Sequence, residues 1–439
     1  MKSPPFNSRK IVSFLTNVKG PNEISMKKIN LTFVLCLFVL AMVHAQSEAD
    51  LTPISSGVKY QLIGRYDLAR LNQVFNKDLD DFLSTSSMSS ADFRGKFATP
   101  VYPVKLYKVE YRSVVPEFGN KPTIATGLVA IPETGLDSMP MISYQHGTVF
   151  EKSNCPSHPD ESMETRMMIA QYASQGYIVI GADYFGLAAS DLPNAYLILE
   201  SSEQACLDML FATQDVLRHK KIKQGPLFLH GWSQGGWTNL AFLRKLESLN
   251  IPVTAAGTAS APADAFGSVD RWMNNYQPID AVYLPGCLSN FIFAVEYYHQ
   301  IPGLAASAIR PEYYESAKKF FNWQISWTDF RKQTVDTIYN FLRPEFMATG
   351  NTGNTPFWQI MEKSQVYRWR CKTPLIMYYG ERDEVVPLYV ATLPQEYHKL
   401  LGRNTTVAKS AGAKADHRAT YTTSVIYLKP WFDGFLKKN

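Results

Sequence analysis

Short apolar segments alternate with helical segments along most of this chain. PMISYQH (140–146), YIVIGADY (177–184) and GPLFLHG (225–231) are strand-like, and the residues between them repeat apolar side chains at helical spacing. Three later segments continue the pattern: VTAAGTAS (253–260), TPLIMYYG (373–380) and TTVAKS (405–410). A helix between two strands allows those strands to run parallel. The order therefore predicts an α/β fold, with a mostly parallel sheet and helices on both of its faces.

The residues before position 140 are expected to lead into this sheet. Residues 60–84 repeat apolar side chains at helical spacing and are interpreted as a helix. Residues 104–115 and 123–131 are interpreted as two strands, joined by the turn-forming sequence PEFGNKP. Between and after the later strands we expect five helices, at 161–175, 195–219, 236–249, 391–402 and 419–437.

The alternation is interrupted between residues 265 and 370. This stretch holds 22 aromatic residues in 106 positions, or 21% against 13% for the whole chain. Four of its rings are expected on one helix face: Phe320, Trp323, Trp327 and Phe330. A small helical insertion cannot bury so many rings alone, so we expect a cap over the carboxyl edge of the sheet, where α/β sheets bind ligands. The expected catalytic domain is then 46–264 together with 371–439, and 265–370 is the cap.

The first 45 residues have the layout of an export leader. MKKINLTFVLCLFVLAMVHAQS begins at Met26 with two lysines, continues as an apolar run and reaches VHA, so it predicts a secretory signal peptide cleaved after Ala45. The run is short for a membrane span, and Leu35 makes Cys36 a poor lipid-attachment site. We interpret Met26 as the true start. We expect an exported protein, secreted or periplasmic, with no stable membrane span after cleavage.

Composition argues against some classes of function. The formal net charge of the chain is +5, and residues 1–45 carry six basic and one acidic residue, so the mature part is neutral. A neutral protein gives no indication of a nucleic-acid partner. No CxxC spacing points to a zinc site, and no metal or organic cofactor is implied. Disulfides and buried thiols both stay open for the four cysteines of the mature part: Cys155, Cys206, Cys287 and Cys371.

Ser233 lies in GWSQG, which has the G-x-S-x-G pattern of a nucleophile elbow. A predicted strand precedes it and a predicted helix follows it, so the serine stands at a strand-to-helix turn. Gly231 and Gly235 leave room for that strand and helix to approach closely. A serine hydroxyl is a weak nucleophile at neutral pH, so it needs a histidine as general base and a carboxylate to hold the histidine.

The other two members of such a triad are expected downstream, in the order acid and then histidine. Asp383 follows a strand in YYGERDEVVP and is the favoured acid, with Glu381 and above all Glu384 as rivals. His417 lies in a loop between the last strand and the closing helix, and it is the favoured base. The other downstream histidines are not expected to reach the serine: His299 inside the insertion and His398 in a helix with a surface-like pattern.

Two backbone N–H groups are expected to bind the oxyanion of an acyl-transfer intermediate. One belongs to Gln234, directly after the serine, and the other to Thr148, in the loop of YQHGT (144–148). Four more residues are expected to shape the site: His146, Gly147, Asp183 and Trp232. His146 precedes the serine and so has the wrong chain order for the base, and Asp183 is equally well a turn former.

Taken in order, these motifs resemble the α/β-hydrolase superfamily and, within it, the secretory lipase or esterase family with a helical cap. The resemblance extends over about residues 105–420 and rests on GLVAIP, YQHGT, ADYFGL, HGWSQGG, TASAPAD, YGERDEVVP and DH. It implies hydrolysis of carboxylic esters through an acyl-enzyme on Ser233, with Asp383 and His417 completing the triad under a helical lid. YQHGT has one glycine where some esterases have HGGG, so the second oxyanion donor departs from that pattern.

The leading interpretation is an exported serine esterase or lipase that acts on a small-molecule or lipid-like ester. The aromatic insertion favours an apolar or aromatic group in that ester. A serine peptidase of the prolyl-oligopeptidase type is an alternative, although too few residues precede the first strand for its usual β-propeller. A non-enzymatic ligand-binding protein on a hydrolase scaffold is another. The natural ester, the choice between lipase and soluble esterase, and the oligomeric state stay open.

Overall fold

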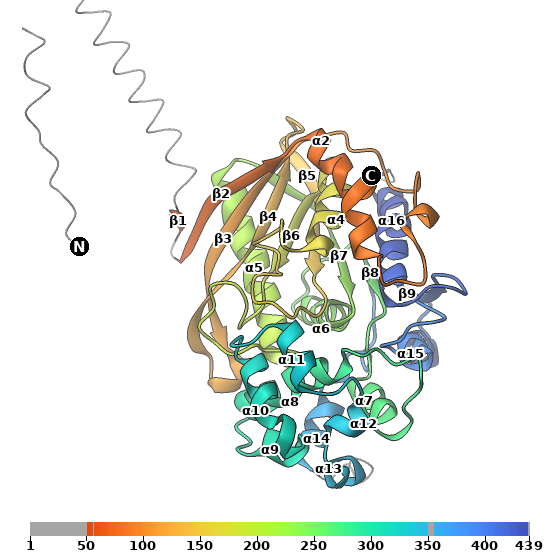
Figure 1. Cartoon of the computed structure of the whole chain (residues 1–439). Helices are drawn as coiled ribbons and strands as arrows, with labels where there is room; N and C mark the ends of the chain where they lie inside the picture. The colour runs from red at the N-terminus through yellow and green to blue at the C-terminus, as the bar shows by residue number, and fades with distance from the viewer. Residues whose placement is uncertain (1–50, 56, 350–354, 438–439) are drawn as a thin grey trace, which may run out of the picture. The chain divides into compact units, whose positions relative to one another are not determined.

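A computed structural model of the chain describes residues 51–55, 57–349 and 355–437, so the predicted leader and signal peptide lie outside the described residues. Its centre is a ten-stranded sheet in the order β1-β2-β3-β4-β6-β5-β7-β8-β9-β10 (Figure 1). The strands are β1 (Thr52–Ser55), β2 (Val58–Tyr66), β3 (Val104–Val115), β4 (Lys121–Pro132), β5 (Ser138–Gln145), β6 (Ile178–Ala182), β7 (Lys223–Trp232), β8 (Ala255–Ala259), β9 (Leu375–Tyr379) and β10 (Thr406–Ser410). From β6 to β10 in this order all neighbours pair parallel, whereas β1 to β4 pair antiparallel and β4 pairs antiparallel with β6.

Helices cover both faces of the sheet, as the alternating pattern predicts. The five main ones are α4 (Met163–Gln171), α5 (Leu199–His219), α6 (Gln234–Ser248), α15 (Leu388–Leu400) and α16 (His417–Leu436). Buried side chains of α5 and α6, such as Trp237, belong to one hydrophobic cluster. Those of α4 and α16, such as Tyr421, belong to a second cluster. The α/β fold class with a mostly parallel sheet is therefore confirmed.

The prediction of a helix over residues 60–84 is wrong in its first third. These residues begin within β2, which pairs antiparallel with β3 from Val58 opposite Tyr111 to Tyr66 opposite Val104. Pairing along the sheet outweighs the helical spacing of the apolar side chains, because strand preference depends on neighbours that a local pattern does not contain. The helical part starts after Asp67, whose carboxylate accepts the N–H of Arg70 at 2.8 Å. It comprises α2 (Leu68–Gln73), a π-helical turn η1 (Val74–Asp78) and α3 (Leu79–Phe82).

Between β8 and β9 the chain forms a run of helices, here called the insertion. They are α7 (Ala265–Asn274), α8 (Leu284–Tyr298), α9 (Leu304–Ala308), α10 (Pro311–Phe321), α11 (Trp327–Gln333), α12 (Ile338–Phe341), α13 (Pro344–Thr349) and α14 (Pro356–Lys363). Figure 1 shows α8 to α14 gathered at one end of the sheet. Buried rings of the insertion, such as Phe291, share a hydrophobic cluster with α5 and α6, so the insertion packs onto the rest of the fold.

The four aromatic side chains expected on one helix face belong to different elements. Phe320 lies in the last turn of α10, Trp327 and Phe330 lie in α11, and Trp323 lies in the turn between these helices, with its φ at 60°. The ring of Phe320 still stacks on that of Phe330, with 4.5 Å between their centroids. The rings therefore meet by the packing of two helices and not along one.

The four cysteines of the described residues are free thiols, and all four are buried. Among the helices of the described ranges, none combines the length and the apolar character needed to cross a bilayer.

Candidate active site

Ser233 lies on the tight turn between β7 and α6. Its backbone has φ 57° and ψ −124°, a conformation that side-chain-bearing residues rarely adopt. The flanking glycines permit this turn, because a Cβ on Gly231 would lie 2.1 Å from the carbonyl oxygen of Gly235. A Cβ on Gly235 would lie 1.9 Å from the carbonyl oxygen of Gln145 at the end of β5. The turn has the geometry expected of a nucleophile elbow.

Asp383 and His417 form a buried pair at the carboxyl ends of two parallel strands. The Nδ1 atom of His417 lies 2.9 and 3.1 Å from the two carboxylate oxygens of Asp383. The Asp383 Oδ1 also accepts the N–H groups of Val385 and Val386, each at 2.9 Å, so the loop after β9 holds the carboxylate. The side chains of His417 and Asp383 are 4% and 3% exposed.

This pairing shifts both pKa values toward the charged pair. Burial alone raises the pKa of Asp383, but the charge and hydrogen bond of His417 reverse this and leave it below its ordinary value. Burial alone lowers the pKa of His417, but Asp383 raises it above its ordinary value. An imidazole held in this way keeps its proton on Nδ1 and leaves Nε2 to accept another.

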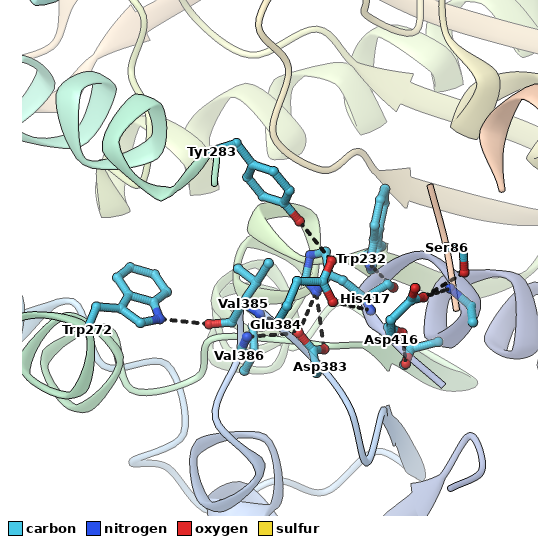
Figure 2. Close-up of polar contacts among 12 residues, drawn as sticks. Ser86, Trp232, Trp272, Tyr283, Asp383, Glu384, Val385, Val386, Asp416 and His417 are labelled. Carbon is cyan, nitrogen blue, oxygen red and sulfur yellow. Dashed lines mark hydrogen bonds and ion pairs between the residues drawn. The ribbon is translucent and has the colours of Figure 1, made fainter. Parts of the chain in front are cut away.

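The two rival carboxylates have other positions. Glu384 binds the backbone of His417 and not its ring: its Oε2 accepts the N–H of His417 at 3.0 Å. Its Oε1 accepts the hydroxyl of Tyr283 from the insertion at 3.3 Å (Figure 2). Glu381 is exposed and accepts the hydroxyl of Ser410 at 2.6 Å. The structure therefore brings Asp383 to the ring of His417 and Glu384 to its backbone.

The other downstream histidines lie apart from this pair. His299 directly follows α8 in the insertion, as expected. His398 is fully buried, contrary to its surface-like pattern in the sequence. Its Nδ1 lies 2.7 Å from the Thr406 hydroxyl and its Nε2 lies 3.1 Å from the Tyr367 carbonyl oxygen. Both ring nitrogens are used in joining α15 to its neighbours, a contact that a helical pattern cannot reveal.

Ser233 and His417 line one cavity of about 470 Å³, together with Gln234 and Thr148. Its aromatic wall comes from two parts of the chain. Phe82, Phe150, Tyr196 and Trp232 come from outside the insertion, and Trp272, Tyr283, Phe291 and Trp327 come from within it. The insertion thus contributes half of the rings around the cavity that holds Ser233.

The backbone around Thr148 and Gln234 has two N–H groups directed at no protein acceptor. The N–H of Gly147 donates to Glu164 Oε2 at 2.8 Å, and the hydroxyl of Thr148 lies 2.8 Å from that of Tyr196. By contrast, within the described ranges the N–H groups of Thr148 and Gln234 donate to no protein atom. Gln234 is the first residue of α6, where N–H groups have no partner within the helix.

His146 and Asp183 lie behind this loop. His146 is buried, stacks on the ring of Tyr184 at 4.1 Å, and has its Nδ1 2.8 Å from the carbonyl oxygen of Gly147. Burial lowers the pKa of His146, so it is neutral at pH 7. Asp183 is fully buried, and its carboxylate accepts the Thr126 hydroxyl at 2.6 Å and the backbone N–H of Ser157 at 2.8 Å. Both residues hold strand ends and loops together, and neither lines the cavity.

Trp232 forms one side of the cavity and supports the histidine. Its Nε1–H donates to the carbonyl oxygen of His417 at 3.1 Å, and the two rings lie 5.0 Å apart. It also stacks on Tyr421, with 4.9 Å between the ring centroids. The residue before the serine therefore positions the first turn of α16.

Two features of the site were not predicted from the sequence. Glu164 is buried in α4, lines the cavity and binds the loop of Thr148. A glutamate in the first turn of a helix is common, because it complements the helix dipole, so nothing in the sequence marks it. The second feature is Asp416, which caps α16 and also accepts the Ser86 hydroxyl at 2.8 Å, tying the segment after α3 to the histidine. That contact joins residues 330 positions apart and leaves no local signal.

Among the described residues, no group of three or more His, Cys, Asp or Glu side chains is arranged to hold a metal ion.

Comparison with known proteins gives similarity in structure only. No family model matches the chain, and no curated protein matches it. A candidate hydrolase from Legionella pneumophila is 21% identical, with 88% of this chain and 99% of that one covered and a TM-score of 0.75. For the rice cell wall degrading esterase LipA from Xanthomonas oryzae, in a ligand-bound form, the identity is 20%, the coverage 88% and 100%, and the TM-score 0.73. Candida antarctica lipase A in its closed state is 16% identical, with 78% of this chain and 84% of that one covered and a TM-score of 0.60. The likeness at these identities is one of fold, and the chain therefore has the α/β-hydrolase fold that this esterase and this lipase share.

Proposed function

We propose that this protein is a serine hydrolase that cleaves carboxylic esters. One observation carries the proposal: Ser233, on a strained strand-to-helix turn, shares a cavity with His417, whose ring is held by the buried Asp383. A buried histidine paired with a carboxylate has no structural need to line the same cavity as a serine on a strained turn. Together the three groups supply what a serine nucleophile requires.

In the proposed reaction the Ser233 Oγ attacks the ester carbonyl while His417 Nε2 accepts its proton. Asp383 stabilises the imidazolium that forms, through the hydrogen bond to Nδ1. The N–H groups of Gln234 and Thr148 donate to the oxyanion of the tetrahedral intermediate. His417 then protonates the leaving alcohol, which leaves an acyl group on Ser233. Water activated by the same histidine hydrolyses that ester and restores the enzyme.

The cavity supports a substrate with an apolar or aromatic group. Its walls carry eight aromatic side chains, which bind apolar groups by burying their surface. Two of the similar structures are an esterase that degrades rice cell walls and a lipase. Both act on esters, so the comparison favours an ester over a peptide. We propose that the insertion is the cap that forms this acyl or alcohol site, and that residues 46–264 with 371–439 form the catalytic domain.

A panel of p-nitrophenyl esters, from acetate to dodecanoate and including a hydroxycinnamoyl ester, tests the activity. We expect hydrolysis of at least one, and loss by about 10⁴-fold or more in Ser233→Ala. A fluorophosphonate probe should label the wild type and not the variant. The absence of both hydrolysis and labelling would contradict the proposal and favour the non-enzymatic ligand-binding alternative. Cleavage of a peptide amide in preference to every ester would favour the peptidase alternative.

We also propose that residues 26–45 act as a signal peptide. The sequence pattern carries this proposal, since these residues lie outside the described ranges. Expression of the full chain in a secreting host, followed by mass spectrometry of the mature protein, should find Gln46 as its first residue. A mature protein that keeps residues 26–45 would contradict it.

A further inference from the structure

Glu164 is a buried carboxylate beside the proposed oxyanion site. It is 8% exposed, and its Oε2 accepts the Tyr144 hydroxyl at 2.5 Å and the Gly147 N–H at 2.8 Å. Its backbone carbonyl oxygen accepts the hydroxyl of Tyr421 at 3.0 Å. The residue is thus connected to β5, to the loop after β5 and to α16. Burying a carboxylate costs free energy unless it is well hydrogen-bonded, and one of the two bonds to this carboxylate comes from the loop that holds Thr148.

Gly147 is confined between this carboxylate and the residue before the nucleophile. A Cβ on Gly147 would lie 3.0 Å from Glu164 Oε1 and 3.1 Å from Cε3 of the Trp232 ring. Gly147 therefore packs closely against both side chains. Only the carboxylate, of these two partners, makes a hydrogen bond to a backbone N–H of the loop. The position of the next N–H, that of Thr148, depends on that bond.

We propose that Glu164 is a positioning residue for the oxyanion site: it takes the N–H of Gly147, fixes the loop, and leaves the N–H of Thr148 to the substrate oxygen. This inference rests on the proposed ester hydrolysis. An oxyanion donor stabilises the transition state only when it lies within about 3 Å of the charged oxygen, so a small shift of the loop lowers kcat. Ground-state binding in the aromatic cavity does not use this bond, so KM should change little.

The ionisation of Glu164 gives the proposal a second readout. Burial raises its pKa to about 7, although the Gly147 N–H, the Tyr144 hydroxyl, His417 and Arg418 act against this rise. The titratable and charged groups that face it are Tyr144 from β5, Tyr184 after β6, and His417, Arg418 and Tyr421 from α16. A charged carboxylate is a stronger acceptor than a neutral one, so the loop is held best above this pKa. On the acid side, activity therefore depends on two ionisations, those of His417 and Glu164.

Two substitutions separate the bond from the charge. Glu164→Gln keeps an oxygen for the Gly147 N–H but cannot ionise, whereas Glu164→Leu has a similar size and no acceptor. We expect Glu164→Leu to lower kcat for p-nitrophenyl butyrate by about 10–100-fold with KM within about threefold, since loss of one oxyanion donor costs about 10²–10³-fold. Glu164→Gln resembles the protonated carboxyl, so kcat at pH 8 should fall by about 3–10-fold, less than in Glu164→Leu. It should also make the acid limb of log kcat/KM shallower than in the wild type, because one of the two ionisations is removed.

Glu117→Gln is the matched control, because Glu117 is another carboxyl whose pKa burial raises, and it binds Ser201 away from the cavity. This control should keep both kcat and the acid slope of the wild type. The inference would be overturned if Glu164→Leu kept the wild-type kcat, whether or not its KM rose. If Glu164→Leu does not fold, an unchanged acid slope in Glu164→Gln overturns it. A wild type that cleaves no ester and takes up no fluorophosphonate refutes the proposed function instead, so the two failures are distinguishable.

Discussion

His417 is the proposed general base, and its ionisation is one of the two that shape the acid side of the pH dependence. Its pKa lies above the ordinary 6.5, because Asp383 and then Glu384 and Asp416 stabilise the imidazolium more than burial opposes it. The ring must be neutral to accept the Ser233 proton. Activity should therefore be present above this raised pKa and be lost as the pH falls through it.

Asp383→Asn removes the main cause of that raised pKa. We expect kcat to fall by up to about 10⁴-fold, as in serine proteases, since the amide no longer selects the reactive tautomer. The acid limb of kcat/KM should also move to lower pH. Hydrolysis of p-nitrophenyl butyrate from pH 5 to 9 measures both effects. Asp329→Asn, at an exposed carboxylate of α11, is the control. If the acid limb of kcat/KM stayed at the wild-type pH in Asp383→Asn, a group other than His417 would set it.

At the scale of elements, the insertion is hydrogen-bonded to the loop that carries Asp383, the proposed catalytic acid. The N–H of Ala281 donates to the carbonyl oxygen of Glu384 at 2.9 Å, and Trp272 Nε1–H donates to that of Val385 at 2.8 Å. The Tyr283 hydroxyl reaches the Glu384 side chain, which in turn holds the N–H of His417 (Figure 2). The insertion and the histidine are thus joined through one carboxylate.

Tyr283→Phe tests whether this link positions His417. A hydrogen bond is worth about 0.5–1.5 kcal/mol net, so we expect kcat to fall by about 2–10-fold. Steady-state kinetics on p-nitrophenyl butyrate measure the change. Tyr297→Phe removes a hydroxyl from a more exposed ring of α8 and should leave kcat unchanged. Equal kcat in the two variants would mean that the insertion does not act on the histidine through Tyr283.

Trp327 borders both the cavity that holds Ser233 and an outer groove between α11 and α12. Trp327 and Thr328 line both the cavity that holds Ser233 and this outer groove of about 600 Å³. The indole stacks on Phe150 with 4.5 Å between centroids. A Cβ on Gly286 would lie 2.7 Å from its Cζ3, so the glycine provides the space for the ring. We therefore predict that this side chain limits the length of the substrate group that fits beside Ser233.

Trp327→Ala should join the cavity to the outer groove and admit esters with longer acyl chains. We expect the ratio of kcat/KM for dodecanoate over butyrate to rise by about tenfold, because added methylenes that find room are buried at about 0.8 kcal/mol each. The p-nitrophenyl ester series measures the ratio. Trp323→Ala, at a tryptophan that binds the Gly186 carbonyl oxygen outside the cavity, is the control. If the folded variant kept the wild-type ratio, a residue other than Trp327 would limit the length of the acyl chain.

For the whole molecule, stability is expected to come from packing without disulfides. The four cysteines are buried free thiols, and burial raises the pKa of each, so none is a reactive thiolate at neutral pH. Dithiothreitol should leave the Tm unchanged, whereas reduction of a native disulfide would cost about 2–5 kcal/mol. Titration of thiols in guanidinium without reductant should find all four of the mature chain. A lower count or a reductant-sensitive Tm would reveal a bridge.

The sequence determined the class of fold, because the alternation of apolar strands and helices is a local property of the chain. It also placed Ser233 in its turn, since the flanking glycines and the order of strand and helix are local. It selected Asp383 and His417 as the favoured pair by chain order, although Glu384, one residue away, could not be separated from Asp383 by spacing.

Only the tertiary structure decided which carboxylate meets the imidazole ring, because adjacent side chains on a loop point in directions that packing sets. It likewise decided that residues 60–66 form β2, whose hydrogen-bond partners lie about 40–50 positions away in β3. Glu164 and Ser86 became visible only there, because each gains its place from contacts with segments far along the chain. Local pattern sets which elements form, and long-range packing determines which side chains they bring together.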